Sequence, residues 1–201
     1  SEAAALQFGG PEVETLPCKS FDEVFEAVVK KRATHGVVPL ENSIGGTIHR
    51  NYDLLLDHEL GITGEVELDI VHCLQALPGT SIADVKVVYS HPQALAQCER
   101  YLKGLGVTVE AVYDTAGGAK LVAEQKLTGA AALASQRAAQ VFGLQVLQEA
   151  VQDFEYNITR FAIIGGVPPA DANKTTIVFA LPSTPGALFK ALSVFALRDI
   201  N

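Results

Sequence analysis

Short apolar segments with two different spacings alternate along almost the whole chain. Segments typical of strands cover residues 36–40, 64–77, 85–89, 107–112, 129–134, 144–151 and 159–164. Segments with helical spacing or helix-start residues cover 1–8, 21–31, 47–58, the residues after Pro92, 115–126 and 136–142. Strands that alternate with helices are the pattern of an α/β fold, and we expect mostly parallel sheets.

Composition and charge exclude several classes of protein. Hydrophobic residues make up 48% of the 201 residues and charged residues 19%, as in a packed globular protein. The net charge is −8 and no basic stripe occurs, so we expect no nucleic-acid partner. No apolar run reaches the ~18 residues needed to cross a bilayer, so we expect no membrane partner. An anionic ligand would have to be held by local donors.

The cysteines predict neither a metal site nor a disulfide framework. Cys18, Cys73 and Cys98 are scattered and odd in number. They lack the paired spacing of zinc ligands, so we interpret them as reduced, mostly buried thiols in a reducing compartment. We expect no metal and no cofactor, because nucleotide-binding glycine motifs are absent too.

A stretch rich in glycine and proline divides the chain. Residues 167–173 have no periodicity and are predicted to be a linker. Residues 175–181 then predict a strand, and Thr184-Pro185 predicts the start of a helix. We therefore expect one large domain over residues 1–166 and a partial second domain over residues 174–201.

Polar side chains follow the predicted strands where helices begin. Glu41, Asn42 and Ser43 follow the first strand, and Ser90 and His91 follow a later one. The carboxyl ends of parallel strands bind ligands in open α/β sheets, and free N–H groups there favour carboxylates. Helix capping is the alternative role for such residues.

Two further residues are candidates for the same cleft. Gln97 comes seven residues after Ser90, within the following helix, and Thr115 stands at a third junction, where it is also a candidate helix cap. The remaining histidines have no motif around them and are predicted to be surface or packing residues: His35, His49, His58 and His72.

Four segments, in order, resemble the prephenate/arogenate dehydratase family. They are Gly36–Thr47, Tyr89–Cys98, Asn157–Phe161 (Asn-Ile-Thr-Arg-Phe) and Pro185–Lys190. Members of that family form the aromatic ring of phenylalanine by expelling water and carbon dioxide. The resemblance implies two lobes like those of a periplasmic binding protein, with chain crossings near residues 60–70 and 148–160.

The resemblance also implies roles for individual residues. Thr159 would be catalytic, because its hydroxyl can donate to the departing oxygen and its β-branch restrains χ1. Substrate contacts would come from Glu41, Asn42, Ser43, Ser90, His91, Gln97, Thr115 and Arg160. An ionised Glu41 would need a partner beside an anionic substrate. Arg160 could bind a carboxylate, but strand alternation turns it away from its neighbour Thr159.

The last segment resembles the opening of a regulatory ACT domain. Gly186, Ala187 and Leu188 would then bind phenylalanine as effector, and the half-domain would complete its core in a homo-oligomer. The resemblance further implies that the dehydratase domain is incomplete at its N-terminal end.

Several alternatives stay open. The substrate could be arogenate or prephenate. The chain resembles plant members most, which implies a chloroplast location; a bacterial member would be cytoplasmic. A two-lobed module that binds solutes or senses amino acids without catalysis is the competing function, since the same fold can serve both.

Overall fold

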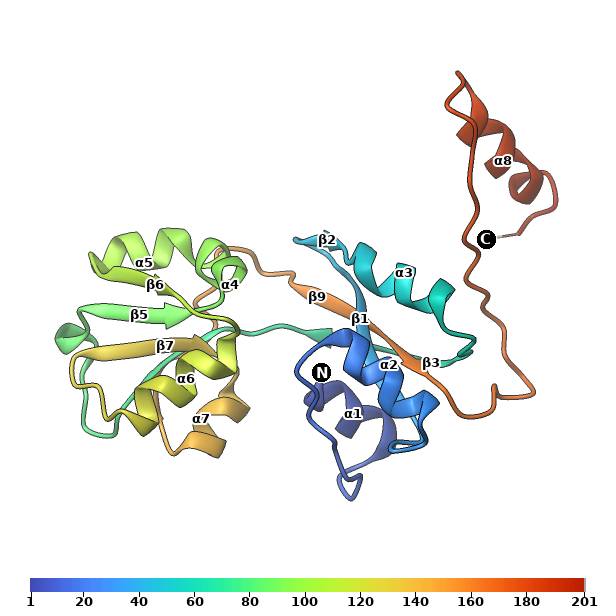
Figure 1. Ribbon diagram of the computed structural model, residues 1–201. Helices are drawn as coiled ribbons and strands as arrows, with labels where there is room; N and C mark the ends of the chain where they lie inside the picture. The colour runs from blue at the N-terminus through green and yellow to red at the C-terminus, as the bar shows by residue number, and fades with distance from the viewer. Residues whose placement is uncertain (201) are drawn as a thin grey trace. The chain divides into compact units, whose positions relative to one another are not determined.

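The computed structural model describes residues 1–200, and their contacts divide the chain after Pro168 into two units. The first unit has two lobes, each with its own sheet (Figure 1). One lobe contains residues 1–69 and 158–168, and the other contains residues 73–148. The chain therefore crosses between the lobes twice, at residues 70–72 and 149–157.

The first lobe is built around a four-stranded sheet with the order β2-β1-β9-β3. Its strands are β1 (Gly36–Asn42), β2 (Gly46–Thr47), β3 (Ile62–Asp69) and β9 (Ile158–Ile164). Strand β9 is antiparallel to both β1 and β3 and lies between them. The last strand in the sequence of this unit is thus a central strand of its sheet.

Helices cover both faces of this sheet. Helices α2 (Phe21–Val29) and α3 (His49–Asp57) pack Phe25 and Leu54 against Ala162 and Ile164 of β9. On the opposite face, helix α1 (Glu2–Gly9) contributes to a second cluster with Phe161 and Ile163 of β9. Alternate residues of β9 therefore belong to different cores, as the period of a strand requires.

The second lobe contains a five-stranded sheet with the order β6-β5-β7-β4-β8. Its strands are β4 (Cys73–Ala76), β5 (Val87–Ser90), β6 (Thr108–Ala111), β7 (Ala130–Ala134) and β8 (Gln145–Gln148). Its helices are α4 (Pro92–Gln97), α5 (Glu99–Leu105), α6 (Thr115–Glu124) and α7 (Gln136–Phe142), with a 3₁₀ turn over Ile82–Asp84. Strand β7 is buried along its whole length, which suits its run of small apolar residues.

The predicted alternation of strands and helices is confirmed, whereas the prediction of mostly parallel sheets is wrong. Only β5–β6 and β5–β7 pair in parallel. All pairs in the first lobe are antiparallel: β1 and β2 form a hairpin, and β9, on which the chain returns to this lobe, runs opposite to β1 and β3. The strand β4, next to the first crossing, is antiparallel to both β7 and β8.

The cysteines agree with their predicted burial. Cys73 and Cys98 are buried, and Cys18 is partly exposed. Burial raises the pKa of Cys98 to about 12, so its side chain is a thiol at neutral pH. Among residues 1–200 there is no helix with the length and apolar character needed to cross a membrane.

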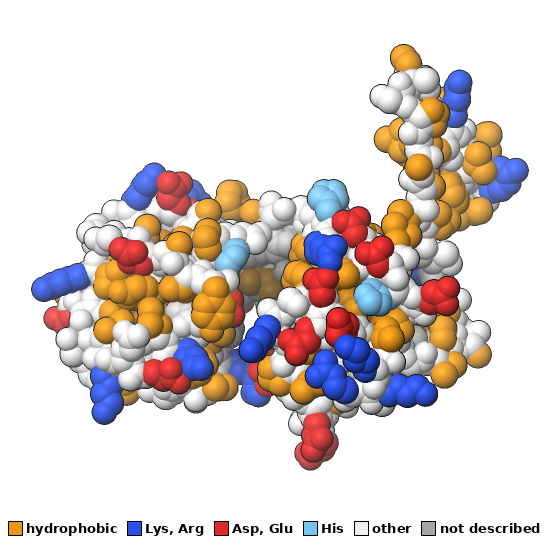
Figure 2. Space-filling model, viewed as in Figure 1, with side chains coloured by type: hydrophobic (Ala, Val, Ile, Leu, Met, Phe, Trp, Pro, Cys, Tyr) orange, Lys and Arg blue, Asp and Glu red, His pale blue; other side chains and the backbone are white. Residues whose placement is uncertain are grey.

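The second unit contains one helix, α8 (Ala187–Ala196). Residues 175–181, predicted as a strand, have no regular secondary structure, so that prediction is wrong for the structure as described. A strand needs a neighbour for its backbone N–H and C=O groups, and residues 1–200 supply none there. Hydrophobic side chains are exposed on both segments, among them Phe179, Phe189 and Leu192 (Figure 2).

Candidate functional site

Five buried polar side chains lie where the chain crosses between the lobes. They are Asn42 at the end of β1, His72 in the first crossing, Gln97 at the end of α4, Asn157 in the second crossing and Thr159 in β9. Each is at most 9% exposed. We call these five residues the hinge network. Buried polar groups are stable only when hydrogen-bonded, so their partners define the site.

The hinge network is a continuous series of hydrogen bonds. The Asn42 Nδ2 donates to Asn157 Oδ1 at 2.7 Å and to Thr159 Oγ1 at 2.9 Å. The Asn157 Nδ2 donates to Gln97 Oε1 at 3.0 Å. His72 Nε2 lies 2.8 Å from the same Gln97 oxygen. Asn42 and Thr159 are opposite each other in the β1–β9 register, which explains their contact.

The direction of these bonds is fixed by the backbone beside Asn42. The N–H groups of Ile44 and Gly45 donate to Asn42 Oδ1, at 3.1 and 2.7 Å. The other amide atom of Asn42 must therefore be the nitrogen, which makes Asn42 the donor to Thr159. The Thr159 oxygen accepts that bond, and its own O–H makes no hydrogen bond within residues 1–200. The hydroxyl proton is thus free for a ligand.

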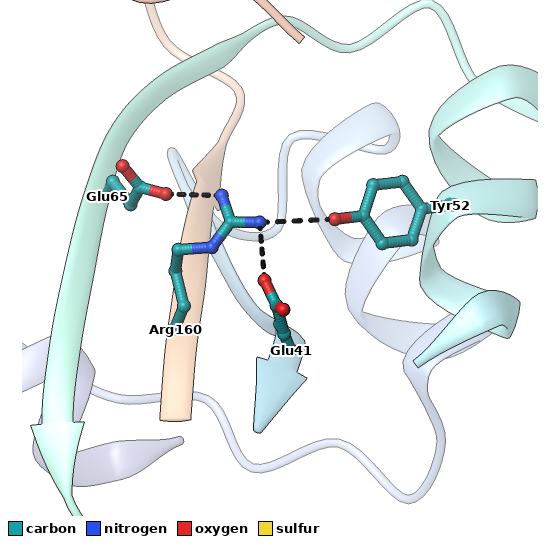
Figure 3. A network of polar contacts seen from close by, with 4 residues as sticks. All are labelled: Glu41, Tyr52, Glu65 and Arg160. Atoms are coloured by element: carbon teal, nitrogen blue, oxygen red, sulfur yellow. Dashed lines mark hydrogen bonds and ion pairs between the residues drawn. The ribbon is translucent and has the colours of Figure 1, made fainter. Parts of the chain in front are cut away.

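Two predicted binding residues of the first lobe, Glu41 and Arg160, pair with each other (Figure 3). The Arg160 guanidinium donates to Glu65 at 2.6 Å, to Glu41 at 3.1 Å and to the Tyr52 hydroxyl at 3.3 Å. The bond to Glu65, more than the one to Glu41, raises the pKa of Arg160 against the opposing effect of burial. Arg160 therefore braces the sheet on the face opposite Thr159, and its pairing neutralises part of the charge of Glu41.

Ser43 bonds to β9 and to the end of the second crossing. Its hydroxyl accepts from the N–H of Ile158 at 3.0 Å and donates to the carbonyl of Tyr156 at 3.3 Å. The backbone N–H of Ser43 donates to the Ile158 carbonyl at 2.8 Å. Ser43 thus holds the end of β1 against the start of β9, next to Asn42 and Thr159.

In the second lobe, three predicted residues lie at one edge of the sheet. The parallel strands β6, β5 and β7 have their carboxyl ends there, followed by the starts of α6, α4 and α7. Ser90 is completely buried and donates its hydroxyl to the Leu133 carbonyl at 2.7 Å. His91 caps α4 by accepting from the N–H of Gln93. Thr115 begins α6, but Asp114 rather than Thr115 caps that helix.

The hinge network therefore contains three of the predicted site residues and two others. Asn42, Gln97 and Thr159 were candidates. Asn157 belongs to the quoted Asn-Ile-Thr-Arg-Phe motif but had no predicted role. His72 was predicted to be a surface or packing residue; it is buried and bonded to Gln97. Its position in a crossing segment between two strands was the available signal, and it is visible only once the lobes are known.

Other possible sites carry less chemistry. Within residues 1–200, no group of three or more His, Cys, Asp or Glu side chains is arranged to hold a metal ion. A groove of about 720 Å³ lies in the first lobe, lined by the ends of α2 and α3 and by Gly165 and Gly166. None of the predicted site residues lines it. The polar side chains at the crossings are therefore the better candidate site.

Comparison with known proteins identifies relatives of the chain. The family model described as prephenate dehydratase matches residues 1–168. Arogenate dehydratase 2 of Petunia hybrida is 53% identical over 205 residues, which cover 100% of this chain and 52% of that protein. Arogenate dehydratase/prephenate dehydratase 2, chloroplastic, of Arabidopsis thaliana is 51% identical over 205 residues, covering 100% of this chain and 54% of that protein. The chain thus spans about half the length of these curated relatives.

A solved structure shares the fold. The prephenate dehydratase of Arthrobacter aurescens, in complex with L-Phe, is 29% identical with a TM-score of 0.84. The likeness covers 98% of this chain and 68% of that one. The two-lobed α/β architecture is therefore shared with a solved relative.

Proposed function

The chain belongs to the prephenate dehydratase family, and we propose that residues 1–166 form a catalytic domain that makes phenylalanine or phenylpyruvate by decarboxylating dehydration. Residues 167–173 would link this domain to a regulatory segment over residues 174–201. The observation that carries the proposal is the free O–H of Thr159, in a site where Asn42, oriented by backbone N–H groups, donates to the threonine oxygen.

The proposed reaction needs a donor more than it needs a base. The ring carboxylate leaves as carbon dioxide, its bonding electrons enter the ring, and the ring C–O bond breaks. The departing hydroxide must receive a proton or a strong hydrogen bond to become water. Thr159 can supply it, because its oxygen accepts from Asn42 and its O–H has no acceptor within residues 1–200.

The free amide nitrogen of Gln97 supports a role in substrate binding. Its oxygen accepts from Asn157 and His72, and its Nε2 makes no hydrogen bond within residues 1–200. The first turn of α6, where Asp114 caps only the N–H of Gly117, provides further N–H donors on the second lobe. Donors from both lobes suit a substrate that carries two carboxylates, even in a protein with a net charge of −8.

The substrate is proposed to be arogenate, with prephenate as the alternative. The support is the names of plant relatives, which are arogenate dehydratases or arogenate dehydratase/prephenate dehydratases. The chloroplastic names of the relatives from Arabidopsis thaliana support a chloroplast location for this chain. Turnover of the two acids, measured side by side, would decide between the substrates.

Replacing Thr159 tests the proposed function. Thr159→Val keeps the shape and removes the O–H, so turnover should fall by at least ~10²-fold while the melting temperature changes little. Thr159→Ser should keep part of the activity, because the donor remains and only the χ1 restraint is lost. Turnover by Thr159→Val within a factor of three of the wild type would remove Thr159 from the mechanism.

A binding module without catalysis remains the second candidate. Such a module would bind arogenate or prephenate and return it unchanged. Isothermal calorimetry combined with detection of carbon dioxide distinguishes the two, since only an enzyme releases carbon dioxide from the bound acid. The free hydroxyl of Thr159 favours the enzyme, because expulsion of hydroxide requires a hydrogen-bond donor and ligand binding alone does not.

We also propose that phenylalanine binds the second unit as an effector and that the protein is a homo-oligomer. Gly186 has φ +78° and precedes α8, and Ala187 and Leu188 form the first turn of that helix. Glycine adopts this backbone without strain and lets N–H groups approach a ligand closely. The complex of the Arthrobacter aurescens relative with L-Phe supports an effector of this kind.

A further inference from the structure

We infer that His72 is a positioning residue for the proposed dehydration: its Nε2–H holds Gln97 and Asn157 in the one orientation that leaves the Thr159 proton free. This inference rests on the proposed function only for its effect on turnover. The hydrogen-bond arrangement itself follows from the contacts of the hinge network.

Each step of the arrangement follows from the one before. Backbone N–H groups fix Asn42 Oδ1, so Asn42 Nδ2 donates to Asn157 Oδ1. The other amide atom of Asn157 is then the nitrogen, and it donates to Gln97 Oε1. Because Gln97 Oε1 can only accept, the His72 nitrogen 2.8 Å away must carry a hydrogen. Neutral His72 is therefore the Nε2–H tautomer.

The charge state of His72 makes this tautomer matter. The residue is 5% exposed, and burial lowers its pKa more than the hydrogen bond to Gln97 raises it. At neutral pH the ring is neutral and has a single N–H. The Nδ1–H tautomer would set a lone pair of Nε2 against the Gln97 oxygen, which favours rotation of the Gln97 amide.

Rotation of Gln97 would disturb the network as far as Thr159. The Gln97 nitrogen would then face the nitrogen of Asn157, donor against donor. Asn157 could relieve that clash only by turning its own nitrogen toward Asn42 Nδ2, which the backbone holds in place. The same Asn42 nitrogen donates to Thr159. Repulsion between the two amide nitrogens would therefore displace the donor that holds the proposed catalytic hydroxyl.

The position of the three residues explains why His72 would be used for this purpose. His72 lies in the first crossing, Asn157 in the second, and Gln97 on α4 of the second lobe. The single oxygen of Gln97 accepts from both crossings. His72 thus fixes the point at which the second lobe is joined to the strand that carries Thr159.

Paired variants of the full chain test this role by kinetics. His72→Leu removes the donor, and we expect kcat to fall by about 10–100-fold, the scale for groups that orient a reacting residue. KM should change by less than about threefold, because the affected donor acts mainly as the C–O bond breaks. His72→Gln restores an N–H near Nε2 and should recover kcat to within about threefold of the wild type.

A matched control is His58→Leu, which removes a first-lobe histidine that stacks on Phe25 outside the hinge network. It should leave kcat unchanged. Equal losses of kcat in His72→Leu and His72→Gln, or an unchanged kcat in His72→Leu, would overturn the inference. The first result would show a purely structural role, and the second would show none.

A second measurement does not depend on activity. The ¹⁵N shifts of the His72 ring in the wild-type chain at neutral pH report which nitrogen carries the proton. A protonated Nε2 with a bare Nδ1 supports the inference, whereas a protonated Nδ1 overturns it. If the wild type turned over neither arogenate nor prephenate, the proposed function would fail, and this spectrum would still decide the arrangement.

Discussion

At the scale of the residue, the site depends on which atom of each amide is oxygen and which is nitrogen. The Asn42 side-chain oxygen accepts hydrogen bonds from two backbone N–H groups, so its nitrogen donates to the neighbouring side chains. A substitution that keeps the shape of the side chain but exchanges donor for acceptor should thus reduce turnover as much as removal of the side chain. Buried hydrogen-bond networks are sensitive in this way because water cannot reach an unpaired group and replace its lost partner.

Asn42→Asp applies that reasoning. The carboxylate accepts from the backbone as before, but its second oxygen has no hydrogen for Thr159. The Thr159 hydroxyl would then donate to Asp and not to the substrate, and we expect turnover to fall by at least ~10²-fold. Steady-state kinetics checks this against Asn173→Asp, the same exchange at an exposed position of the linker, which should be silent. A fully active Asn42→Asp would contradict the donor assignment of Asn42.

The acid sensitivity of folding should also contain a contribution from His72. Its pKa is lowered by burial, so the unfolded chain binds the proton more readily than the folded one. The stability that depends on neutral His72 is present above the unfolded pKa of about 6.5 and is lost as the pH falls through the folded pKa. Between pH 7 and pH 5, urea unfolding of His72→Gln should lose less stability than the wild type. If the free energy of unfolding changed equally with pH in both proteins, a buried, neutral His72 would be contradicted.

At the scale of the element, the sequence predicted most helices and strands of the first unit but not their pairing. Residues 136–142 form a helix with the predicted bounds, and most other elements differ by a few residues. Local spacing and capping residues determine these elements. The antiparallel position of β9 depends on where the chain returns, and local patterns do not contain that information.

The same limit applies to the site. Strand ends and motif residues indicated Asn42, Gln97 and Thr159, but His72 and the role of Asn157 needed the tertiary structure. Ser90 occurs at a strand end like the others, yet its hydroxyl bonds to the Leu133 carbonyl. A polar residue at a strand end can serve either a ligand or its own backbone, and only the neighbouring strand decides.

Strand β9 should be the element that is most sensitive to truncation of side chains. Ile163 is fully buried in a core cluster of the first lobe. Ile163→Ala should lower the free energy of unfolding by about 2–5 kcal/mol, through lost burial and a cavity. Val178→Ala, at a position that is 49% exposed in the second unit, should cost less than about 0.5 kcal/mol. Urea denaturation of both variants gives the comparison, and similar losses would contradict the burial pattern.

At the scale of the whole molecule, the two units differ in how far they can be stable alone. The first unit contains both sheets and the buried hydrophobic clusters that pack against them in each lobe. The helix of the second unit has no buried residue, and four of its large apolar side chains are exposed: Leu188, Phe189, Leu192 and Val194. Such a segment gains stability only by packing against something else.

A chain ending at Pro168 should therefore fold and keep the proposed dehydratase activity. It should lose the response to phenylalanine and the oligomeric state proposed for the full chain. Calorimetry with phenylalanine and light scattering on both proteins provide the measurement. Equal phenylalanine binding by the two would move the effector to the catalytic cleft and remove the proposed role of Gly186, Ala187 and Leu188.

The central place of β9 also has a consequence for synthesis on the ribosome. The second lobe is one continuous stretch and can fold as soon as it has emerged. The first lobe must wait, with the facing edges of β1 and β3 unpaired, until β9 follows roughly 5–20 s later at ordinary elongation rates. During that interval the nascent chain exposes strand edges that can pair with other chains. A slower passage through the second lobe would lengthen this exposure, so codon usage there should influence the yield of folded protein.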